Sequence, residues 1–103
     1  MIKKVTTQEL EAVIAQNNEN TVLIDVRAAE ECAEGIIEGA DNLDLFQPDF
    51  IERIGKLDKS KDYYMICRSG GRSNSAAGAM DDMGFESVTN MLGGMLAWNG
   101  KTV

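Results

Sequence analysis

The chain has 103 residues, of which 44% are hydrophobic and 26% are charged, and its formal net charge at pH 7 is −7. This length suits a single domain over residues 1–103, and the composition is that of an ordinary globular protein. The acidic balance disfavours nucleic acid and anionic membrane surfaces as partners, because both are negatively charged.

The residue inventory restricts the chemistry further. The sequence has no histidine and two cysteines, Cys32 and Cys67. A Cys–His or Ser–His–Asp mechanism within one chain is therefore excluded, and so is a four-ligand zinc site. We expect neither a metal nor an organic cofactor. No apolar run has the pattern of a signal peptide or a membrane span, so we expect a cytoplasmic protein whose thiols stay reduced.

The first elements alternate between strand and helix patterns. Residues 2–5 predict a short strand, and Thr6 with Glu9 fits a capping box at the start of a helix. A β-branched apolar run over residues 21–26 predicts a strand buried on both faces, as in a parallel sheet. An Ala- and Glu-rich stretch over residues 28–34 predicts a short helix.

The middle of the chain continues this alternation. Residues 42–45 predict a short strand, and Pro48 fits the first turn of the next helix. We expect the apolar stripe of that helix to consist of Phe50, Ile51, Ile54 and Leu57. Residues 63–66 predict a strong strand that leads directly into Cys67.

The last elements are a long helix, a strand and a short helix. Residues 73–83 predict the long helix, and Gly84 is a suitable stop. Residues 87–91 predict the strand, and residues 95–98 predict the short helix. Regular alternation of strands and helices predicts an α/β fold, with an open, mostly parallel sheet covered by helices on both faces.

One loop combines the features of a reactive site. Its sequence is Cys67-Arg68-Ser69-Gly70-Gly71-Arg72-Ser73, and we call residues 67–73 the cysteine loop. The loop follows a strand and precedes a helix, which is where ligands bind in open α/β sheets. The helix N-terminus, inward-turned amides at the glycines and the two arginine charges would all lower the pKa of the thiol.

The alternative is a buried, inert cysteine beside ordinary surface arginines. The charge distribution favours function, because Arg68 and Arg72 are the only basic residues between Lys61 and Lys101. A local concentration of positive charge in an acidic protein suits a small anionic substrate.

Four segments resemble the rhodanese family. The cysteine loop is similar to that family's active-site loop, Cys-x-x-Gly-x-Arg-Ser. Residues 23–27 are similar to its Leu-x-Asp-Val-Arg segment, and residues 30–40 match its Glu-x-x-x-Gly-His-Ile-x-Gly-Ala run in most positions. Residues 92–98 are similar to its Leu-x-Gly-Gly-x-x-x-Trp segment. Together the four segments span nearly the whole chain in the family's order.

The resemblance implies a three-layer fold with a five-stranded parallel sheet, and a ping-pong sulfur transfer. Cys67 would be the catalytic nucleophile, which takes sulfur from a donor such as thiosulfate and holds it as a persulfide. The substrate would be bound by the rest of the cysteine loop: Arg68, Ser69, Gly70, Gly71, Arg72 and Ser73. The acceptor would be cyanide or a thiol, including a thiol on a protein.

Several residues depart from the pattern or admit two interpretations. Ile36 and Glu38 stand where the family has His and Pro, which bears on substrate preference. Asp25 and Arg27 are expected to be structural, with Arg27 paired to Glu31 or Glu30. Cys32 is either a resolving thiol or, as we favour, a small apolar residue on the inner face of its helix. Ser73 could bind substrate or cap its helix.

Two other functions compete with sulfur transfer. Cysteine phosphatases and arsenate reductases also place a cysteine and an arginine at a helix N-terminus, but with five residues between them. Here four residues separate Cys67 from Arg72, which makes a tighter cradle. No general-acid aspartate is evident, although Asp25 remains a candidate. A non-enzymatic protein-binding or sulfur-carrier module is the third interpretation.

Overall fold

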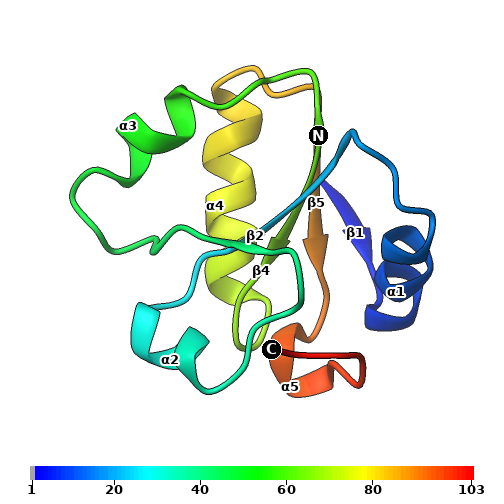
Figure 1. Cartoon of the computed structure of the whole chain (residues 1–103). Coiled ribbons are helices and arrows are strands. Elements are labelled where there is room, and N and C mark those ends of the chain that lie inside the picture. Colours follow the sequence, from blue (N-terminus) through cyan, green and yellow to red (C-terminus); the bar gives the residue numbers. More distant parts are fainter. Residues whose placement is uncertain (1) are drawn as a thin grey trace.

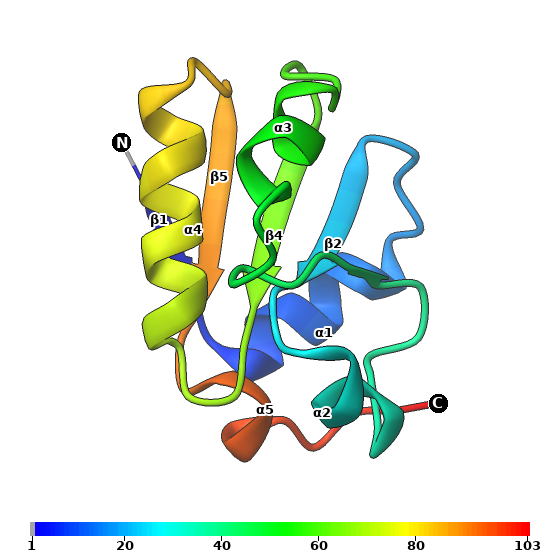
Figure 2. The same cartoon turned by 90° about the vertical axis from the view of Figure 1, so that its left-hand side faces the viewer.

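The computed structural model describes residues 2–103, and its centre is a five-stranded sheet in which every pairing is parallel (Figures 1 and 2). The spatial order is β1-β5-β4-β2-β3. The strands are β1 (Lys3–Val5), β2 (Thr21–Asp25), β3 (Asp41–Asn42), β4 (Asp62–Ile66) and β5 (Ser87–Met91). The helices are α1 (Thr7–Ala15), α2 (Ala29–Ala33), α3 (Phe50–Gly55), α4 (Gly71–Asp82) and α5 (Gly94–Ala97). The predicted fold class is confirmed.

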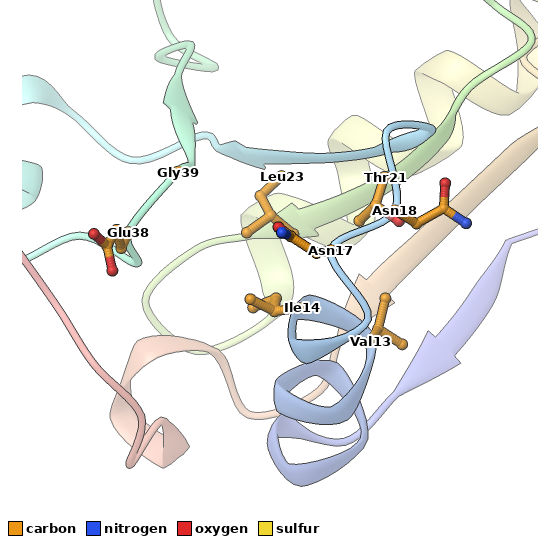
Figure 3. Close-up of a pocket in the computed structure, with 8 residues that line it drawn as sticks. All are labelled: Val13, Ile14, Asn17, Asn18, Thr21, Leu23, Glu38 and Gly39. Atoms are coloured by element: carbon orange, nitrogen blue, oxygen red, sulfur yellow. The ribbon is translucent and has the colours of Figure 1, made fainter.

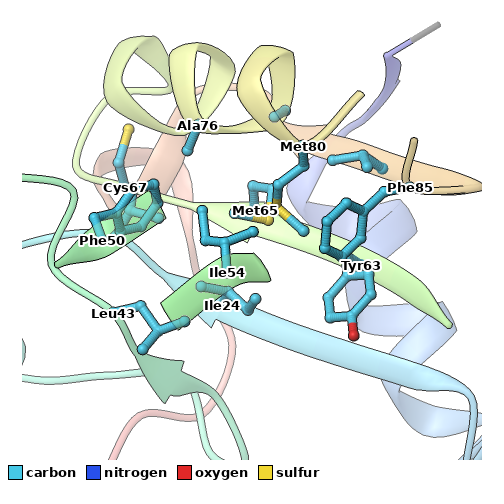
Figure 4. Packing of buried hydrophobic residues seen from close by; sticks show 13 residues of the cluster. Ile24, Leu43, Phe50, Ile54, Tyr63, Met65, Cys67, Ala76, Met80 and Phe85 are labelled. Atoms are coloured by element: carbon cyan, nitrogen blue, oxygen red, sulfur yellow. The ribbon is translucent and has the colours of Figure 1, made fainter. Parts of the chain in front are cut away.

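One face of the sheet is covered by α3 and α4. Alternate residues of β4 point to this side, and Cys67 continues that alternation beyond the end of the strand. Figure 4 shows Cys67 and Phe50 at one end of this apolar cluster and Tyr63 and Phe85 at the other. The rings of Tyr63 and Phe85 meet edge to face, with their centroids 5.3 Å apart.

The opposite face is covered mainly by α1 and α5. Leu10 of α1 is fully buried there, against a cluster that includes Ile66 and Met91. The predicted capping box starts α1, because the amide of Glu9 donates to the Thr6 hydroxyl and the amide of Thr6 donates to the Glu9 carboxylate. Burial on both faces explains why the central strands read as continuous apolar runs.

Two expectations for the middle of the chain are wrong. Pro48 lies before α3, not in its first turn, since α3 begins at Phe50. The amide of Phe50 donates to the carbonyl of Gln47, so Pro48 occupies the second position of a turn, where its fixed φ is equally favourable. Ile51 is 54% exposed, so it does not belong to the buried stripe.

Two element boundaries also differ. The strand expected over residues 42–45 pairs with β2 only at Asp41–Asn42. After it, the amides of Leu43 and Leu45 donate to the carbonyls of Asp25, the last residue of β2, and Val26. The long helix starts at Gly71, two residues before its expected start at Ser73. The first turn of α4 therefore includes the last three residues of the cysteine loop, Gly71, Arg72 and Ser73. No helix within residues 2–103 is long and apolar enough to cross a membrane.

Candidate active site

Cys67 directly follows β4, the central strand of the sheet, at its carboxyl end and immediately before the turn into α4. The residue is 1% exposed. In Figure 2 the turn from β4 into α4 lies at the same end of the molecule as α2 and α5. The structure therefore places the cysteine where open α/β sheets bind ligands.

Hydrogen-bond donors surround the thiol. The amide of Gly70 donates to Cys67 Sγ at 3.0 Å, and the hydroxyl of Ser73 lies 3.2 Å from the same sulfur. Burial alone would raise the pKa of the Cys67 thiol. The Ser73 hydroxyl and the amides of Ser73, Gly70 and Ser69 outweigh that effect, so the pKa of Cys67 is lowered from its ordinary value.

The two glycines of the cysteine loop have different roles. Gly70 is the N-cap residue of α4 and has a φ of +103°, a conformation that side chains disfavour. That conformation accompanies an amide directed at Cys67 Sγ. Gly71 has no positive φ, and a Cβ added there would meet nothing within 4 Å. The turned amide therefore depends on Gly70 rather than on both glycines.

The two arginines of the loop are not equivalent either. Arg68 is exposed, and within residues 2–103 the structure gives it no ion pair. Arg72 instead donates from Nη1 and Nη2 to both carboxylate oxygens of Glu31, at 2.7 and 2.9 Å. Its charge is largely compensated by α2, so the expected excess of positive charge at the loop rests on Arg68.

Asp25 and Arg27 form the buried ion pair at the end of β2. Arg27 Nη2 lies 2.8 Å from Asp25 Oδ2 and also donates to the carbonyl of Gly35 at 2.8 Å. The expected pairing of Arg27 with the carboxylate of Glu31 or Glu30 is wrong, because Arg27 forms its ion pair with Asp25, two positions earlier in the chain. Asp25 is fully buried and held by Arg27, so it is not available as a general acid.

Cys32 is half-buried on α2. Burial raises the pKa of its thiol to about 11, and the neighbouring Asp25 adds to the rise. The two cysteines are thus opposite in character, and the environment of Cys32 favours the neutral thiol.

Sequence reasoning missed two contributors to the site. Asn90, 3% exposed on β5, bonds to both the Gly70 carbonyl and the Ser73 hydroxyl. Gly94 starts α5, whose amides at Met95 and Leu96 donate to the carbonyls of the cysteine loop. A Cβ at Gly94 would come within 2.6 Å of the Cys67 carbonyl. The sequence signal for Asn90 was an amide side chain near the carboxyl end of a predicted strand, the end at which open α/β sheets bind ligands.

The hollow next to the loop has a volume of about 480 Å³. It is lined by Arg27, Glu31, Glu34, Arg68, Met95 and Leu96. A second hollow of about 180 Å³ lies between the end of α1, β2 and Gly39 (Figure 3), and none of its lining residues belongs to the cysteine loop. Of these two hollows, the first contains a residue of the cysteine loop, Arg68, so it is the candidate entrance for a substrate that reacts at Cys67.

Known proteins resemble this chain in sequence and in architecture. A family model for the rhodanese-like domain matches residues 6–101. The protein named "Putative sulfurtransferase YtwF" from Bacillus subtilis is 44% identical over 98% of this chain and 94% of its own length. A "Sulfurtransferase" from Allochromatium vinosum is 31% identical over 95% and 89%, respectively. A crystal structure of a rhodanese-like domain protein from Staphylococcus aureus has a TM-score of 0.84 at 28% identity, covering 96% of this chain and 93% of that one. The chain belongs to the rhodanese-like domain family.

Proposed function

We propose that the protein is a sulfurtransferase that carries sulfane sulfur as a persulfide on Cys67. The observation that carries the proposal is the set of donors around Cys67 Sγ, formed by the Gly70 amide and the Ser73 hydroxyl. These donors lower the pKa of the thiol and so increase the thiolate fraction, which is the nucleophilic form. The sulfurtransferase relatives support the same reaction class.

In the first half-reaction, the Cys67 thiolate attacks the outer sulfur of a donor such as thiosulfate. A bond forms between Cys67 Sγ and that sulfur, and the sulfur–sulfur bond of the donor breaks. Sulfite leaves with the electron pair, and the enzyme keeps a persulfide whose charge is on the outer sulfur. No proton has to move, which fits a site without histidine.

In the second half-reaction, cyanide or an acceptor thiolate attacks the outer sulfur of the persulfide. The bond to Cys67 Sγ breaks, and the electron pair returns to Cys67 as thiolate. The donors that stabilise the thiolate at the start also stabilise it as the leaving group here. The same acceptor chemistry is open to a thiol on a protein.

Phosphoester or arsenate chemistry is less well supported. Such a reaction needs an arginine that is free to clamp a tetrahedral oxyanion, whereas both terminal nitrogens of Arg72 are bound by Glu31. Asp25 is buried against Arg27, which leaves it unable to protonate a leaving group. Sulfur transfer requires neither group.

The test is the intact mass of reduced protein after treatment with thiosulfate. The expected result is a gain of one sulfur in the wild type and in Cys32→Ala, but not in Cys67→Ser. Cyanide should remove the gain and release thiocyanate in equal amount. Loading that persists in Cys67→Ser would move the site to Cys32, and hydrolysis of a phosphate ester without any sulfur uptake would favour the phosphatase alternative.

A further inference from the structure

The hydroxyl of Ser73 has more acceptors than hydrogens. It lies 3.2 Å from Cys67 Sγ, 3.2 Å from the carbonyl oxygen of Gly70 and 2.5 Å from Asn90 Oδ1. A serine hydroxyl carries one hydrogen, so these three acceptors compete for it. Ser73 is fully buried, and Asn90 is 3% exposed, so an unbonded group here would be costly.

The carbonyl of Gly70 does not need the Ser73 hydrogen. Its oxygen has two lone pairs and already accepts from the amide of Asn74 and from Asn90 Nδ2, each at 3.2 Å. The contest for the hydrogen is therefore between Cys67 Sγ and Asn90 Oδ1.

The orientation of the Asn90 amide is fixed by the same contacts. A carbonyl can only accept, so the nitrogen of the Asn90 side chain has to face Gly70. The oxygen then faces the Ser73 hydroxyl and can accept its hydrogen. Asn90 thus offers the hydroxyl an acceptor that does not depend on the state of the sulfur.

We infer that Asn90 is a positioning residue that shares the Ser73 hydrogen with Cys67 Sγ, as a hydroxyl switch that follows the charge on the sulfur. When Sγ is a thiolate, the hydrogen points to the sulfur, because a charged acceptor makes the stronger bond. When Sγ is uncharged, as in the thiol or in the inner sulfur of a persulfide, the hydrogen returns to Asn90 Oδ1. The persulfide part of this inference rests on the proposed sulfur transfer.

The switch links two equilibria that are otherwise unrelated. Protonation of Cys67 and sulfur loading of Cys67 both convert a charged Sγ into an uncharged one. The bond between Ser73 and Asn90 stabilises both uncharged states in the same way. Removing the Asn90 acceptor should therefore shift both equilibria toward the thiolate, and by the same factor.

Other charges around the thiol stay constant in such a test. Arg72 of α4, whose guanidinium interacts with the charge of Cys67, is held by Glu31 of α2. Arg68 follows Cys67 in the chain and is exposed. A neutral replacement at Asn90 alters none of them.

The experiment measures the pKa of Cys67 from the pH dependence of alkylation, in a Cys32→Ala background that leaves one cysteine. Asn90→Leu is expected to lower this pKa by about 0.7, a fivefold change that corresponds to one neutral hydrogen bond. The ratio of loaded to unloaded enzyme, measured above the pKa at fixed ratios of thiosulfate to sulfite, should fall by about the same fivefold factor.

A double-mutant cycle with Ser73→Ala separates the switch from a general structural role. Without the hydroxyl, Asn90→Leu should leave the pKa of Cys67 unchanged. An equal shift in both backgrounds would overturn the inference and place the effect in the backbone of the cysteine loop. The folded state of each variant is checked by circular dichroism.

Asn90→Asp provides a second, independent test, because it should shift the pKa of Cys67 in the opposite direction. Its carboxylate would hold the Ser73 hydrogen more strongly and bring a negative charge, so the pKa of Cys67 should rise. Shifts of the same sign in Asn90→Leu and Asn90→Asp would refute the switch. If the wild type takes up no sulfur, the proposed function fails, while the pKa cycle still decides the sharing of the hydrogen.

Discussion

Arg72, at the start of α4, binds both carboxylate oxygens of Glu31 on α2, although 41 positions separate the two residues in the chain. The pair joins α2, whose Glu31 lines the hollow beside the cysteine loop, to the first turn of α4. It also neutralises the charge of Arg72, which the loop sequence alone predicts to bind the substrate. Its consequences for stability and for anion binding can be measured separately.

Glu31→Gln should destabilise the protein in a pH-dependent way. The Arg72 guanidinium holds the pKa of Glu31 at about 2, below the ordinary value of 4.5. Because the folded-state pKa is depressed, the contribution is complete above about pH 5 and is lost as the pH falls through about 2. We expect Glu31→Gln to lower the free energy of unfolding by about 1 kcal/mol at pH 7. In urea titrations, the difference from the wild type should shrink as the pH falls and vanish below about pH 2.

The control for this prediction is Glu30→Gln, which removes the same charge from the exposed residue one position earlier. Its effect at pH 7 should be within about 0.5 kcal/mol. An equal loss in both variants would show that helix charge, and not the ion pair, accounts for the effect.

The same variant should bind an anionic sulfur donor more tightly. Release of Arg72 adds an uncompensated guanidinium beside the hollow, so the KM for thiosulfate should fall about fivefold, equivalent to roughly 1 kcal/mol. Adding Arg72→Met to Glu31→Gln should abolish the gain. A gain that survives in the double variant would mean that the lost negative charge of Glu31 acts directly.

Gly70 and Gly71 form a matched pair for a substitution test. Gly70→Ala should lower the free energy of unfolding by about 1–2 kcal/mol, because alanine is strained at a φ of +103°. It should also slow alkylation of Cys67, since the amide that donates to the sulfur shifts. Gly71→Ala adds a Cβ in open space and should do neither. Equal effects at both positions would contradict the assignment of the turned amide to Gly70.

These relationships show what the sequence could and could not predict. The cysteine loop was predictable because a strand, a glycine turn and a helix start are local patterns. The partner of Arg72 was not, because Glu31 lies 41 positions earlier in the chain and only the tertiary fold brings the two side chains together. Pro48 was misplaced because a helix start and a turn favour proline for the same fixed φ.

The misassigned partner of Arg27 has a different cause. A charge beside a buried strand was expected to pair with one of the glutamates that follow, but Arg27 precedes α2 and folds back onto Asp25. Asn90 was overlooked because its function depends on two groups 17 and 20 positions away, Ser73 and Gly70. Contacts of this kind follow from strand order, which local patterns leave open.

Cys32→Ala should leave the chemistry of Cys67 unchanged. The raised pKa of Cys32, about 11, keeps that thiol protonated at neutral pH, where it is a poor nucleophile. We expect sulfur loading and the rate of alkylation at Cys67 to stay within about twofold of the wild type, equivalent to roughly 0.4 kcal/mol. A Cys32–Cys67 disulfide in oxidised wild type, accompanied by slower turnover of the variant, would instead identify Cys32 as a resolving thiol.

Of the single substitutions proposed in this section, Asp25→Asn should lower the free energy of unfolding the most. It leaves the guanidinium of Arg27 buried without its charge partner, which typically costs about 3 kcal/mol. Glu52→Gln, which breaks an ion pair between side chains that are 71% and 75% exposed, should cost under about 0.5 kcal/mol. Both values follow from urea denaturation at pH 7.

The double variant Asp25→Leu with Arg27→Met decides whether the buried pair itself stabilises the fold. Removing both charges removes the desolvation cost as well, so the double variant should be more stable than Asp25→Leu alone. The recovery should be partial, because Arg27 also donates to the carbonyls of Gly35 and Glu31 and so holds α2 against the end of β2. If the double variant is no more stable than Asp25→Leu, the loss arises from those backbone bonds and from packing, and the charge on Asp25 is not its cause.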